Sequence, residues 1–412
     1  MSRKPPAWLE TAVKSDKYIR MVFIDLEERE VKRDAARNST RHRQDNEFMG
    51  HAYRRVVDKN HATHYSIAIA THPSNEGSNR YTNVEPYDRS RVIVQSTALT
   101  GAPVSPASSE QLDPHGRYLN ASWVLEKFGQ KWWIANQAPL PNTAHAFLSV
   151  ILQPVTQPQV SGTALPPFSR EISRTSRVRT VVQLTRNIED GRRKADAYFP
   201  TEVGRSVVLR AESGYNGPPL AVKLLHTNSH ADTSSIESII SISPFDDITK
   251  KPNEGKAVIF RHLLYLKWPD HGVPEPEDTD SLLAFVHQVH RLNKDLSIYP
   301  AHQANMTVRG VPELDPDPPI MVGCSAGIGR TGSFVVLSSL LRHFGFLDAP
   351  IRPSPSSVLK PSPLGPLPDN LTSDLVAQEV DSLREQRPGM VQRPEQVALI
   401  YQVLMDAFMS QT

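Results

Sequence analysis

The chain has 412 residues, of which 39% are hydrophobic, and its 46 Lys and Arg against 44 Asp and Glu give a formal net charge of +2. This length allows two to three average domains or one large domain with insertions, and the near balance of charge gives no bulk electrostatic support for binding nucleic acid or a membrane. A single cysteine excludes an internal disulfide framework, and the sequence shows neither an apolar signal core nor a run approaching about 18 apolar residues. We therefore expect a soluble protein in a reducing compartment, the cytoplasm, with the nucleus as a second candidate.

Residues 16–57 are highly charged, and their apolar residues recur at helical intervals: Tyr18, Met21, Phe23, Ile24 and Leu26. This pattern predicts a peripheral helical region. We assign residues 1–74 to an N-terminal helical extension packed on one large domain, residues 75–412. The run Glu27–Arg37 mixes charges of both signs, which favours a solvated helix face over a partner site.

The following part of the chain predicts framework elements. A polar loop at 79–91 leads into a short strand, Val92–Gln95, and aromatic and apolar alternation indicates further strands that begin near Tyr118 and Trp132. Asn142 and Thr143 are expected to cap the helix that follows. Further on, 180–184 is typical of a buried strand.

Stretches rich in Pro, Ser or other polar residues interrupt this framework. We interpret them as insertions, near 99–116, 154–179, 227–256, 299–318 and 350–369. The proline-rich segment 350–369 predicts a disordered or extended loop. The segment 154–179 carries a basic cluster, which favours a solvated loop, with a docking surface for acidic substrate segments as the alternative; the cluster consists of Arg170, Arg174, Arg177 and Arg179.

The stretch 264–275 predicts a strand that ends in a hinged loop. Tyr265 lies among apolar residues, and Pro269, Gly272 and Pro274 then interrupt the strand pattern. Asp270 lies within this loop, where an aspartate by itself is a turn former. An amphipathic helix is predicted over residues 279–293.

The only cysteine lies in a strand–turn–helix pattern at 319–332. The apolar run Ile320–Val322 predicts a buried strand, a glycine-rich turn follows, and Arg330 opens an apolar-periodic helix. Gly327 and Gly329 allow successive backbone N–H groups to point inward, and this arrangement makes an anion-binding nest. The helix N-terminus and a bidentate Arg330 would add to the affinity for phosphate, and the same positive field stabilises a thiolate at Cys324 that can attack phosphorus.

The string CSAGIGRTG at 324–332 resembles the phosphate-binding loop of the phosphotyrosine-specific protein tyrosine phosphatases. Other stretches resemble motifs of that family in the same order: the phosphotyrosine-recognition loop at 79–92, the acidic–basic hairpin at 189–200, the movable Trp-Pro-Asp loop at 268–270 and the glutamine loop at 392–396. The resemblance covers about residues 75–410. It implies an α/β fold with a twisted, mostly parallel mixed sheet flanked by helices.

The resemblance also implies a two-step phosphoryl transfer without a metal or other cofactor. Cys324 attacks, Asp270 protonates the leaving tyrosine, and Gln392 then aligns the water that hydrolyses the phosphocysteine. Tyr81 stacks on the substrate ring, and Thr331 hydrogen-bonds the sulfur. In full, the catalytic roles fall to Cys324, Arg330, Asp270, Gln392 and Thr331, and the substrate-binding roles to Tyr81, Asn83, Lys194, Ser325, Ala326, Gly327, Ile328, Gly329 and Gln396.

Among the departures from the family pattern, two bear on whether the protein is an active enzyme. Gly323 replaces the histidine that precedes the cysteine, and Asn83 replaces an aspartate that grips the substrate peptide. They support the competing interpretation, a weakly catalytic module that binds phosphotyrosine. A scaffold built on the insertions is a third class, and a phosphoinositide phosphatase is disfavoured because the loop has no lysines. For an active enzyme, we expect a Gly323→His variant to stabilise the Cys324 thiolate further.

The expected partners follow from the resemblance. They are phosphotyrosine-containing proteins, with no nucleic acid and no membrane, and the enzyme is expected to be a monomer that acts in signal transduction. The insertions resemble those of fungal members of the family. Because some of these act on mitogen-activated protein kinases, such kinases are candidate substrates.

Overall fold

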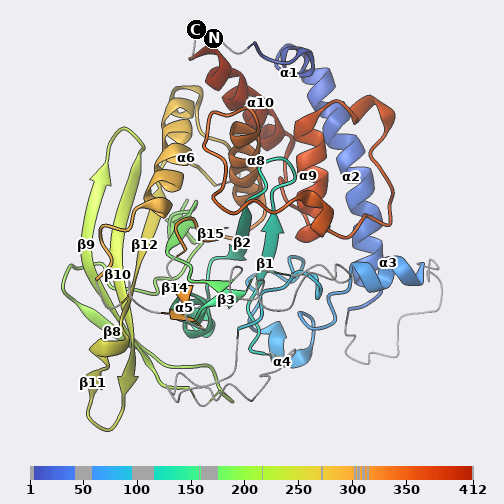
Figure 1. Ribbon diagram of the computed structural model, residues 1–412. Helices are drawn as coiled ribbons and strands as arrows, with labels where there is room; N and C mark the ends of the chain where they lie inside the picture. Colours follow the sequence, from blue (N-terminus) through green and yellow to red (C-terminus); the bar gives the residue numbers. More distant parts are fainter. Residues whose placement is uncertain are drawn as a thin grey trace.

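A twisted nine-stranded sheet forms the centre of the molecule (Figure 1). The computed structural model describes residues 4–41, 58–94, 116–156, 158, 175–215, 217–270, 272–300, 303, 307–308, 311–312 and 315–410. Within these residues, the strands follow the order β1-β2-β15-β5-β12-β10-β9-β8, and β11 pairs with β10. The strands are β1 (Ala121–Leu125), β2 (Trp132–Gln137), β5 (Thr180–Gln183), β8 (Ser206–Leu209), β9 (Leu220–His230), β10 (Ser235–Asp246), β11 (Lys251–Pro252), β12 (Val258–Tyr265) and β15 (Ile320–Cys324).

Parallel pairing is confined to the central strands β2, β15, β5 and β12. The pairs toward both edges, β1 with β2 and then β12, β10, β9 and β8 in turn, are antiparallel. The predicted mixed sheet flanked by helices is therefore confirmed. Three separate two-stranded ladders complete the described strands: β3 (Val155–Thr156) with β4 (Thr175–Ser176), β6 (Ile188–Glu189) with β7 (Arg192–Arg193), and β13 (Thr307–Val308) with β14 (Val311–Pro312).

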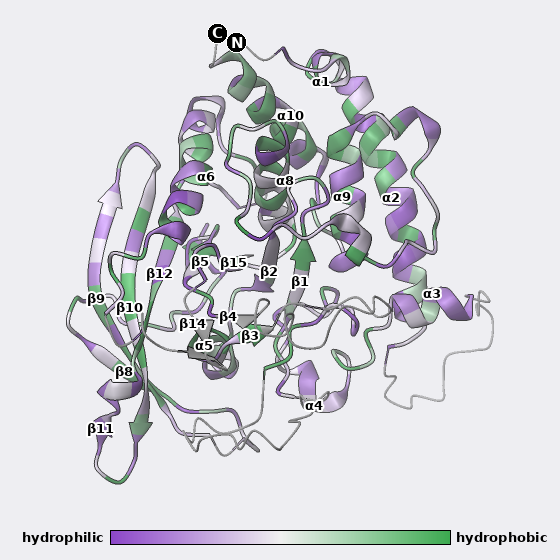
Figure 2. Ribbon diagram, in the orientation of Figure 1, coloured by the Kyte–Doolittle hydropathy of each residue, from purple (hydrophilic) through white to green (hydrophobic). Residues whose placement is uncertain are grey.

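The central strands are apolar on both faces because helices cover both. In β15, Ile320 and Val322 point into one core and Met321 points into the other, and all three are fully buried. A continuous apolar run is what a strand buried on two faces requires. By contrast, the outer half of β9 is largely exposed, and Figure 2 shows hydrophilic residues along it.

The larger helical layer covers one face of the sheet. In it, α8 packs on β15, α6 on β5 and α9 on β1, while α10 packs on α8 and α1 on α10. On the other face, α5 packs against β10 and β12. The helices are α1 (Ala7–Ala12), α2 (Asp16–Asn38), α3 (Lys59–His64), α4 (Pro73–Glu76), α5 (Ala144–Leu152), α6 (Thr279–Lys294), α8 (Gly329–His343), α9 (Leu375–Gln386) and α10 (Pro394–Met409).

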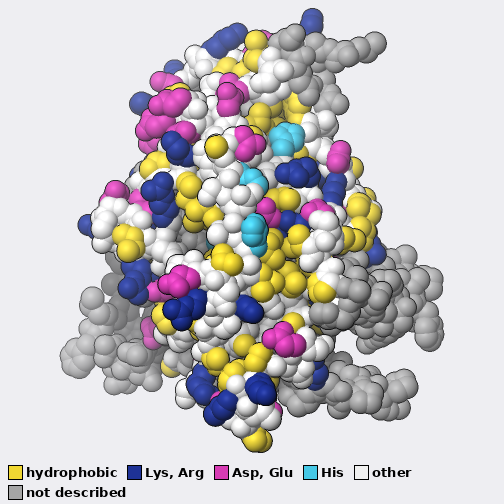
Figure 3. Space-filling view, turned by 90° about the vertical axis from the view of Figure 1, so that its left-hand side faces the viewer, with side chains coloured by type: hydrophobic (Ala, Val, Ile, Leu, Met, Phe, Trp, Pro, Cys, Tyr) yellow, Lys and Arg dark blue, Asp and Glu magenta, His cyan; other side chains and the backbone are white. Residues whose placement is uncertain are grey.

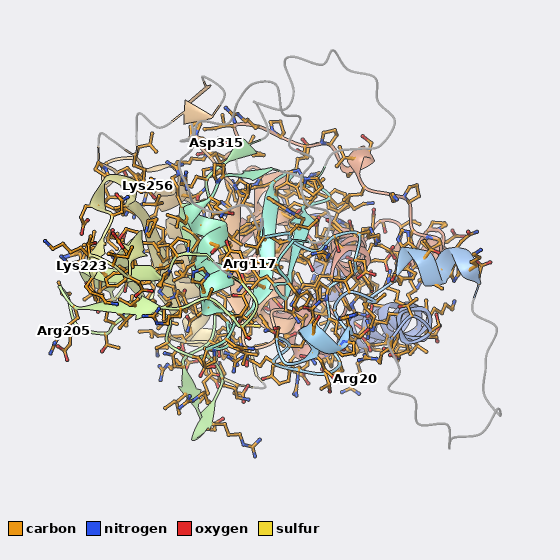
Figure 4. All side chains as sticks on the ribbon, turned by 90° about the horizontal axis from the view of Figure 1, so that it is seen from below. Arg20, Arg117, Arg205, Lys223, Lys256 and Asp315 are labelled. Carbon is orange, nitrogen blue, oxygen red and sulfur yellow. The ribbon has the colours of Figure 1, made fainter. Side chains whose placement is uncertain are left out.

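The surface carries charges of both signs, as the small net charge suggests. Figure 3 shows Lys and Arg interspersed with Asp and Glu on the face that includes β9 and α6. Arg205, Lys223 and Lys256 lie on the β8–β11 side of the sheet, whereas Arg117 lies inside the molecule and pairs with Glu212 (Figure 4). No helix among the described residues is both long enough and apolar enough to span a membrane.

The expectation of a solvated charged face on α2 is wrong. Arg29, Arg33 and Arg37 are buried, because they pair with acids that α9 and α2 itself supply. Arg33 Nη2 lies 2.5 Å from Asp381 Oδ1 and 2.7 Å from Glu385 Oε1. The mixed charges of 27–37 therefore attach α2 to α9 through a buried ionic cluster.

Other expectations also need correction. Arg177 and Arg179 are buried rather than solvated; their guanidinium groups donate to backbone oxygens of α5 and α6. No strand forms over 92–94; isolated bridges link Arg91 to Ser122 of β1 and Val94 to Arg117.

The predicted insertions fall partly outside the described residues. Segment 350–369 is described throughout, and it is irregular but ordered, with a short 3₁₀ turn at Ser356–Val358. Gln95, Arg170, Arg174, nearly all of 99–116 and much of 154–174 and 299–314 lie outside the described residues.

The buried cluster predicts a loss of stability in acid. Burial alone would raise the pKa of Glu385, but hydrogen bonds from His64, Arg33 and Ser362 and the charge of Arg33 lower it from 4.5 to about 2. A carboxylate with a lowered folded-state pKa contributes stability above its unfolded pKa and loses it as the pH falls toward the folded value. We expect this contribution to be on the order of 2–4 kcal/mol.

Urea unfolding of wild type and Glu385→Gln at pH 7, 5 and 3 checks this expectation. The variant should be less stable at pH 7, and the difference from wild type should shrink toward pH 3. Glu202→Gln is the control, because the Glu202 side chain is 72% exposed. An equal difference at every pH would show that Glu385 ionisation does not stabilise the α2–α9 contact.

Candidate functional site

The turn between β15 and α8 holds its backbone carbonyls on the outside. Ala138 N–H donates to Cys324 O at 2.9 Å and to Ser325 O at 3.1 Å. Arg387 donates to Ala326 O at 3.0 Å and to Gly327 O at 2.7 Å. The four backbone carbonyls from Cys324 to Gly327 therefore each accept a hydrogen bond from a neighbouring segment.

The backbone N–H groups of the same turn are left for another partner. Among the described residues, no acceptor receives a hydrogen bond from the N–H groups of Ser325 through Arg330. Gly327 makes this turn possible with φ of 72°, and a Cβ there would lie 2.2 Å from Asn136 O. Consecutive N–H groups of this kind at a helix N-terminus form an anion-binding nest, with Cys324 at its start.

Arg330 is fixed beside the nest by a bidentate ion pair. Its Nη1 and Nη2 each lie 2.7 Å from an oxygen of Glu189, and Nη1 also donates to Leu184 O. Burial would lower the pKa of Arg330, but the hydrogen bond to Glu189 and the nearby carboxylates of Glu189 and Asp270 raise it. Nε donates to no described residue, so an oxyanion can take this donor while the cation stays in place.

The Trp-Pro-Asp loop lies against the same arginine. Arg330 Nη1 donates to Trp268 O at 3.3 Å, and Nη2 lies 3.1 Å from Asp270 Oδ1. The other oxygen of Asp270 pairs with Lys194 Nζ. The structure thus brings Asp270, Lys194 and Arg330 together at the edge of the nest.

The recognition loop reaches the nest through Tyr81. Its hydroxyl lies 2.8 Å from Ser325 Oγ, and Ser325 Oγ donates its own proton to Lys194 O at 2.7 Å. Since a serine hydroxyl carries one proton, Tyr81 is the donor to Ser325. Asn83 is exposed, as a residue that meets a substrate peptide would be.

The glutamine loop contributes one buried and one exposed side chain. Gln396 is buried against Gly329, where a Cβ would lie 2.8 Å from Gln396 Nε2. Gln396 Oε1 accepts a hydrogen bond from the backbone N–H of Gln392, whose side chain is exposed. The Thr331 hydroxyl is buried without a partner among the described residues, so its expected bond to the sulfur stays a prediction.

Sequence reasoning missed two residues that shape this site. Glu189 was placed in a hairpin but not recognised as the partner of Arg330. Arg387 is fully buried, and burial lowers its pKa to about 10. It donates to loop carbonyls and to Ser122 and Asn120. A single arginine or glutamate in a polar stretch carries no signal for such long-range contacts.

The structure changes what is expected of Gly323. A Cβ at this position would lie 2.7 Å from both the Nδ2 and the backbone O of Asn136. Any side chain, histidine included, therefore displaces β2 or β15. The expectation that Gly323→His stabilises the thiolate took no account of this packing and stays a prediction.

Comparison with known proteins gives a consistent result. Residues 75–160 and 171–348 match the family described as protein-tyrosine phosphatase. Over 354 residues the chain is 26% identical to receptor-type tyrosine-protein phosphatase eta of Gallus gallus, covering 85% of this chain and 18% of that protein. Over 348 residues it is 26% identical to tyrosine-protein phosphatase non-receptor type 2 of Rattus norvegicus, covering 84% and 60%.

A third relative is similar over a shorter stretch. It is the putative receptor-type tyrosine-protein phosphatase mosPTP-1 of Aedes aegypti, 27% identical over 292 residues, or 69% of this chain and 17% of that protein. The chain thus spans at most 60% of the length of these relatives. All three are animal proteins, so the resemblance to fungal members stays a prediction.

No group of three or more His, Cys, Asp or Glu is arranged for a metal ion in the described part of the chain.

The Arg330–Glu189 pair predicts how the nest binds oxyanions. Glu189→Gln keeps the shape of the side chain but removes the charge that orients Arg330, so tungstate should bind about 10-fold more weakly or worse. Isothermal titration calorimetry measures this, with Glu202→Gln on the exposed loop before β8 as the control. Unchanged tungstate affinity in Glu189→Gln would mean that Arg330 needs no fixed partner.

Proposed function

Because this chain belongs to the protein-tyrosine phosphatase family, we propose that it hydrolyses phosphotyrosine in proteins through a phosphocysteine intermediate. The observation that carries the proposal is the nest itself: consecutive N–H groups with no acceptor among the described residues, a fixed arginine and one cysteine at the same strand end. This set binds a phosphate dianion and favours a thiolate next to it.

In the first step, the Cys324 sulfur forms a bond to phosphorus while the bond from phosphorus to the tyrosine oxygen breaks. Nε of Arg330 and the loop N–H groups hold the equatorial oxygens, where charge is concentrated in the transition state. The leaving phenolate takes a proton from Asp270, which lies at the edge of the nest beside Lys194. Phosphate that occupies Arg330 would weaken the present Arg330–Asp270 contact and free the acid for this transfer.

In the second step, water attacks phosphorus, Asp270 accepts the proton of the water, and the thiolate leaves. Gln392 is exposed beside the buried Gln396, which suits a side chain that aligns a water arriving from solvent. We extend the proposal to Thr331 as a donor to the leaving sulfur. We also propose phosphotyrosine-containing proteins in the cytoplasm as the substrates, with mitogen-activated protein kinases as candidates.

Turnover and binding separate this proposal from a phosphotyrosine-binding module. Wild type should release phosphate from a phosphotyrosyl peptide in EDTA, and Cys324→Ser should lose turnover while still binding the peptide, because the nest and Arg330 remain. Phosphate release and peptide binding by fluorescence anisotropy measure the two properties. Binding without release by wild type would favour the module, and turnover by Cys324→Ser would rule out the covalent route.

The role of Asp270 is tested by the leaving group. Asp270→Asn should lower kcat by a factor on the order of 10²–10⁴ for phosphotyrosine, the usual contribution of a general acid. The loss should be much smaller for an aryl phosphate with a very acidic phenol, since its leaving group needs no proton. Steady-state kinetics with a series of aryl phosphates measures this. A loss that is the same for every leaving group would remove Asp270 from this role.

A further inference from the structure

Asn136, the residue before the end of β2, lies under the phosphate loop at two points. It is the register partner of Gly323 in β15. A Cβ on Gly323 would lie 2.7 Å from Asn136 Nδ2, and a Cβ on Gly327 would lie 2.2 Å from Asn136 O. The residue before the nucleophile and the left-handed residue of the loop therefore both pack on Asn136, and both are glycines.

The Asn136 side chain is buried and only partly satisfied. It is part of a residue that is 3% exposed, and its Nδ2 donates to Gln137 O at 2.8 Å. Its Oδ1 is buried with no hydrogen-bond donor among the described residues. A buried acceptor without a donor costs stability. Asparagine therefore fits this position only if the volume of its amide, or the hydrogen bond that its Nδ2 donates, stabilises the surrounding structure.

The segment that Asn136 belongs to connects the loops of the site. Gln137 accepts a hydrogen bond from Arg80 N at 2.9 Å and donates to Ser78 O at 2.9 Å, which fixes the approach to Tyr81. Ala138 N donates to Cys324 O and Ser325 O. A shift of residue 136 would therefore move the nucleophile and the recognition loop together.

We propose that Asn136 is a positioning residue for the nucleophile. Its amide occupies the volume that a side chain at position 323 would fill, and its backbone carbonyl lies against Gly327 of the phosphate loop. Gly323 and Asn136 thus form a size-complementary pair, in which the asparagine amide and the backbone carbonyl of residue 136 together leave room only for glycine. The effect on turnover rests on the proposed function, whereas the effect on Cys324 itself does not.

A double-mutant cycle tests the pair with the smallest possible change at each position. Gly323→Ala, Asn136→Ala and the double variant are compared by iodoacetate alkylation of Cys324 against pH, followed by mass spectrometry, and by kcat and KM for p-nitrophenyl phosphate in EDTA. The alkylation rate reports the thiolate and its position without any turnover. An absence of turnover in wild type would therefore contradict the proposed function and leave the alkylation comparison intact.

The expected result is a rescue. Gly323→Ala should slow alkylation at pH 7 about 10-fold or more in the native background, and at most about 3-fold when residue 136 is alanine. The steric conflict is relieved only in part, because the backbone carbonyl of residue 136 also lies 2.7 Å from the new Cβ and remains in the alanine variant. The relief that does occur comes from removal of the amide, which lets the residue 136 peptide move. Asn136→Ala alone should slow alkylation and raise KM, since it removes the amide that fills the space beside Gly323, directly before the nucleophile.

Matched controls separate these effects from general loss of stability. A Cβ on Gly77 meets nothing within 4 Å, and Asn38 lies exposed on α2, so Gly77→Ala and Asn38→Ala should leave alkylation unchanged. Thermal unfolding is recorded for every variant. An equal loss of alkylation rate from Gly323→Ala in both backgrounds would overturn the pairing. A Gly323→Ala substitution that prevents folding in both backgrounds would overturn it as well. Normal alkylation in Asn136→Ala would overturn the positioning role.

Discussion

The orientation of the peptide groups between Cys324 and Arg330 is the constraint on which the rest of the site depends. In a trans peptide unit the N–H and the C=O point in opposite directions, so an N–H that faces the nest leaves its C=O facing outward. A buried carbonyl without a hydrogen-bond donor costs stability, so the outer side of the loop must supply donors. Here Ala138 and Arg387 supply the outer donors. The anion affinity of the inner surface is therefore prepared by contacts on the opposite side of the loop.

Arg387 is in turn held in place by contacts between helices α9 and α2. Arg387 follows directly from α9, whose Glu385 is held by Arg33 of α2. Burying an arginine without a carboxylate partner is expensive, as its lowered pKa indicates, so its surroundings must hold it firmly. The α2–α9 cluster fixes the helix end from which Arg387 reaches the loop. The ion pairs of α2 thus support the helix end that carries Arg387.

The sequence predicted the local elements of the site well, because their signals are short-range. The strand Ile320–Val322, the glycine turn and a helix that opens at Arg330, one residue after the observed start of α8, follow from hydrophobic pattern and backbone geometry within a few residues. The loop that carries Asp270 follows from its Pro and Gly residues, but the role of Asp270 in the site rests on the family resemblance; the structure brings Asp270 to Arg330.

The errors arose where distant residues decide the outcome. The charges of α2 are buried because Asp381 and Glu385 lie opposite them, some 350 positions away in the chain. Arg177, Arg387 and Glu189 likewise meet partners that no local pattern reveals. Gly323 was interpreted as a missing histidine, but its meaning depends on Asn136, which neighbours it only across the sheet.

The central claim is that the nest prepares Cys324 to carry the phosphoryl group. The most direct measurement is a rapid quench of Gln392→Ala mixed with a phosphotyrosyl peptide, followed by mapping of the phosphoryl group by mass spectrometry. Because this variant should hydrolyse the intermediate slowly, the phosphoryl group is predicted on the Cys324 sulfur and on no other residue. Turnover that continues without any phosphoryl group on Cys324, or a phosphoryl group on a different side chain, would contradict the account.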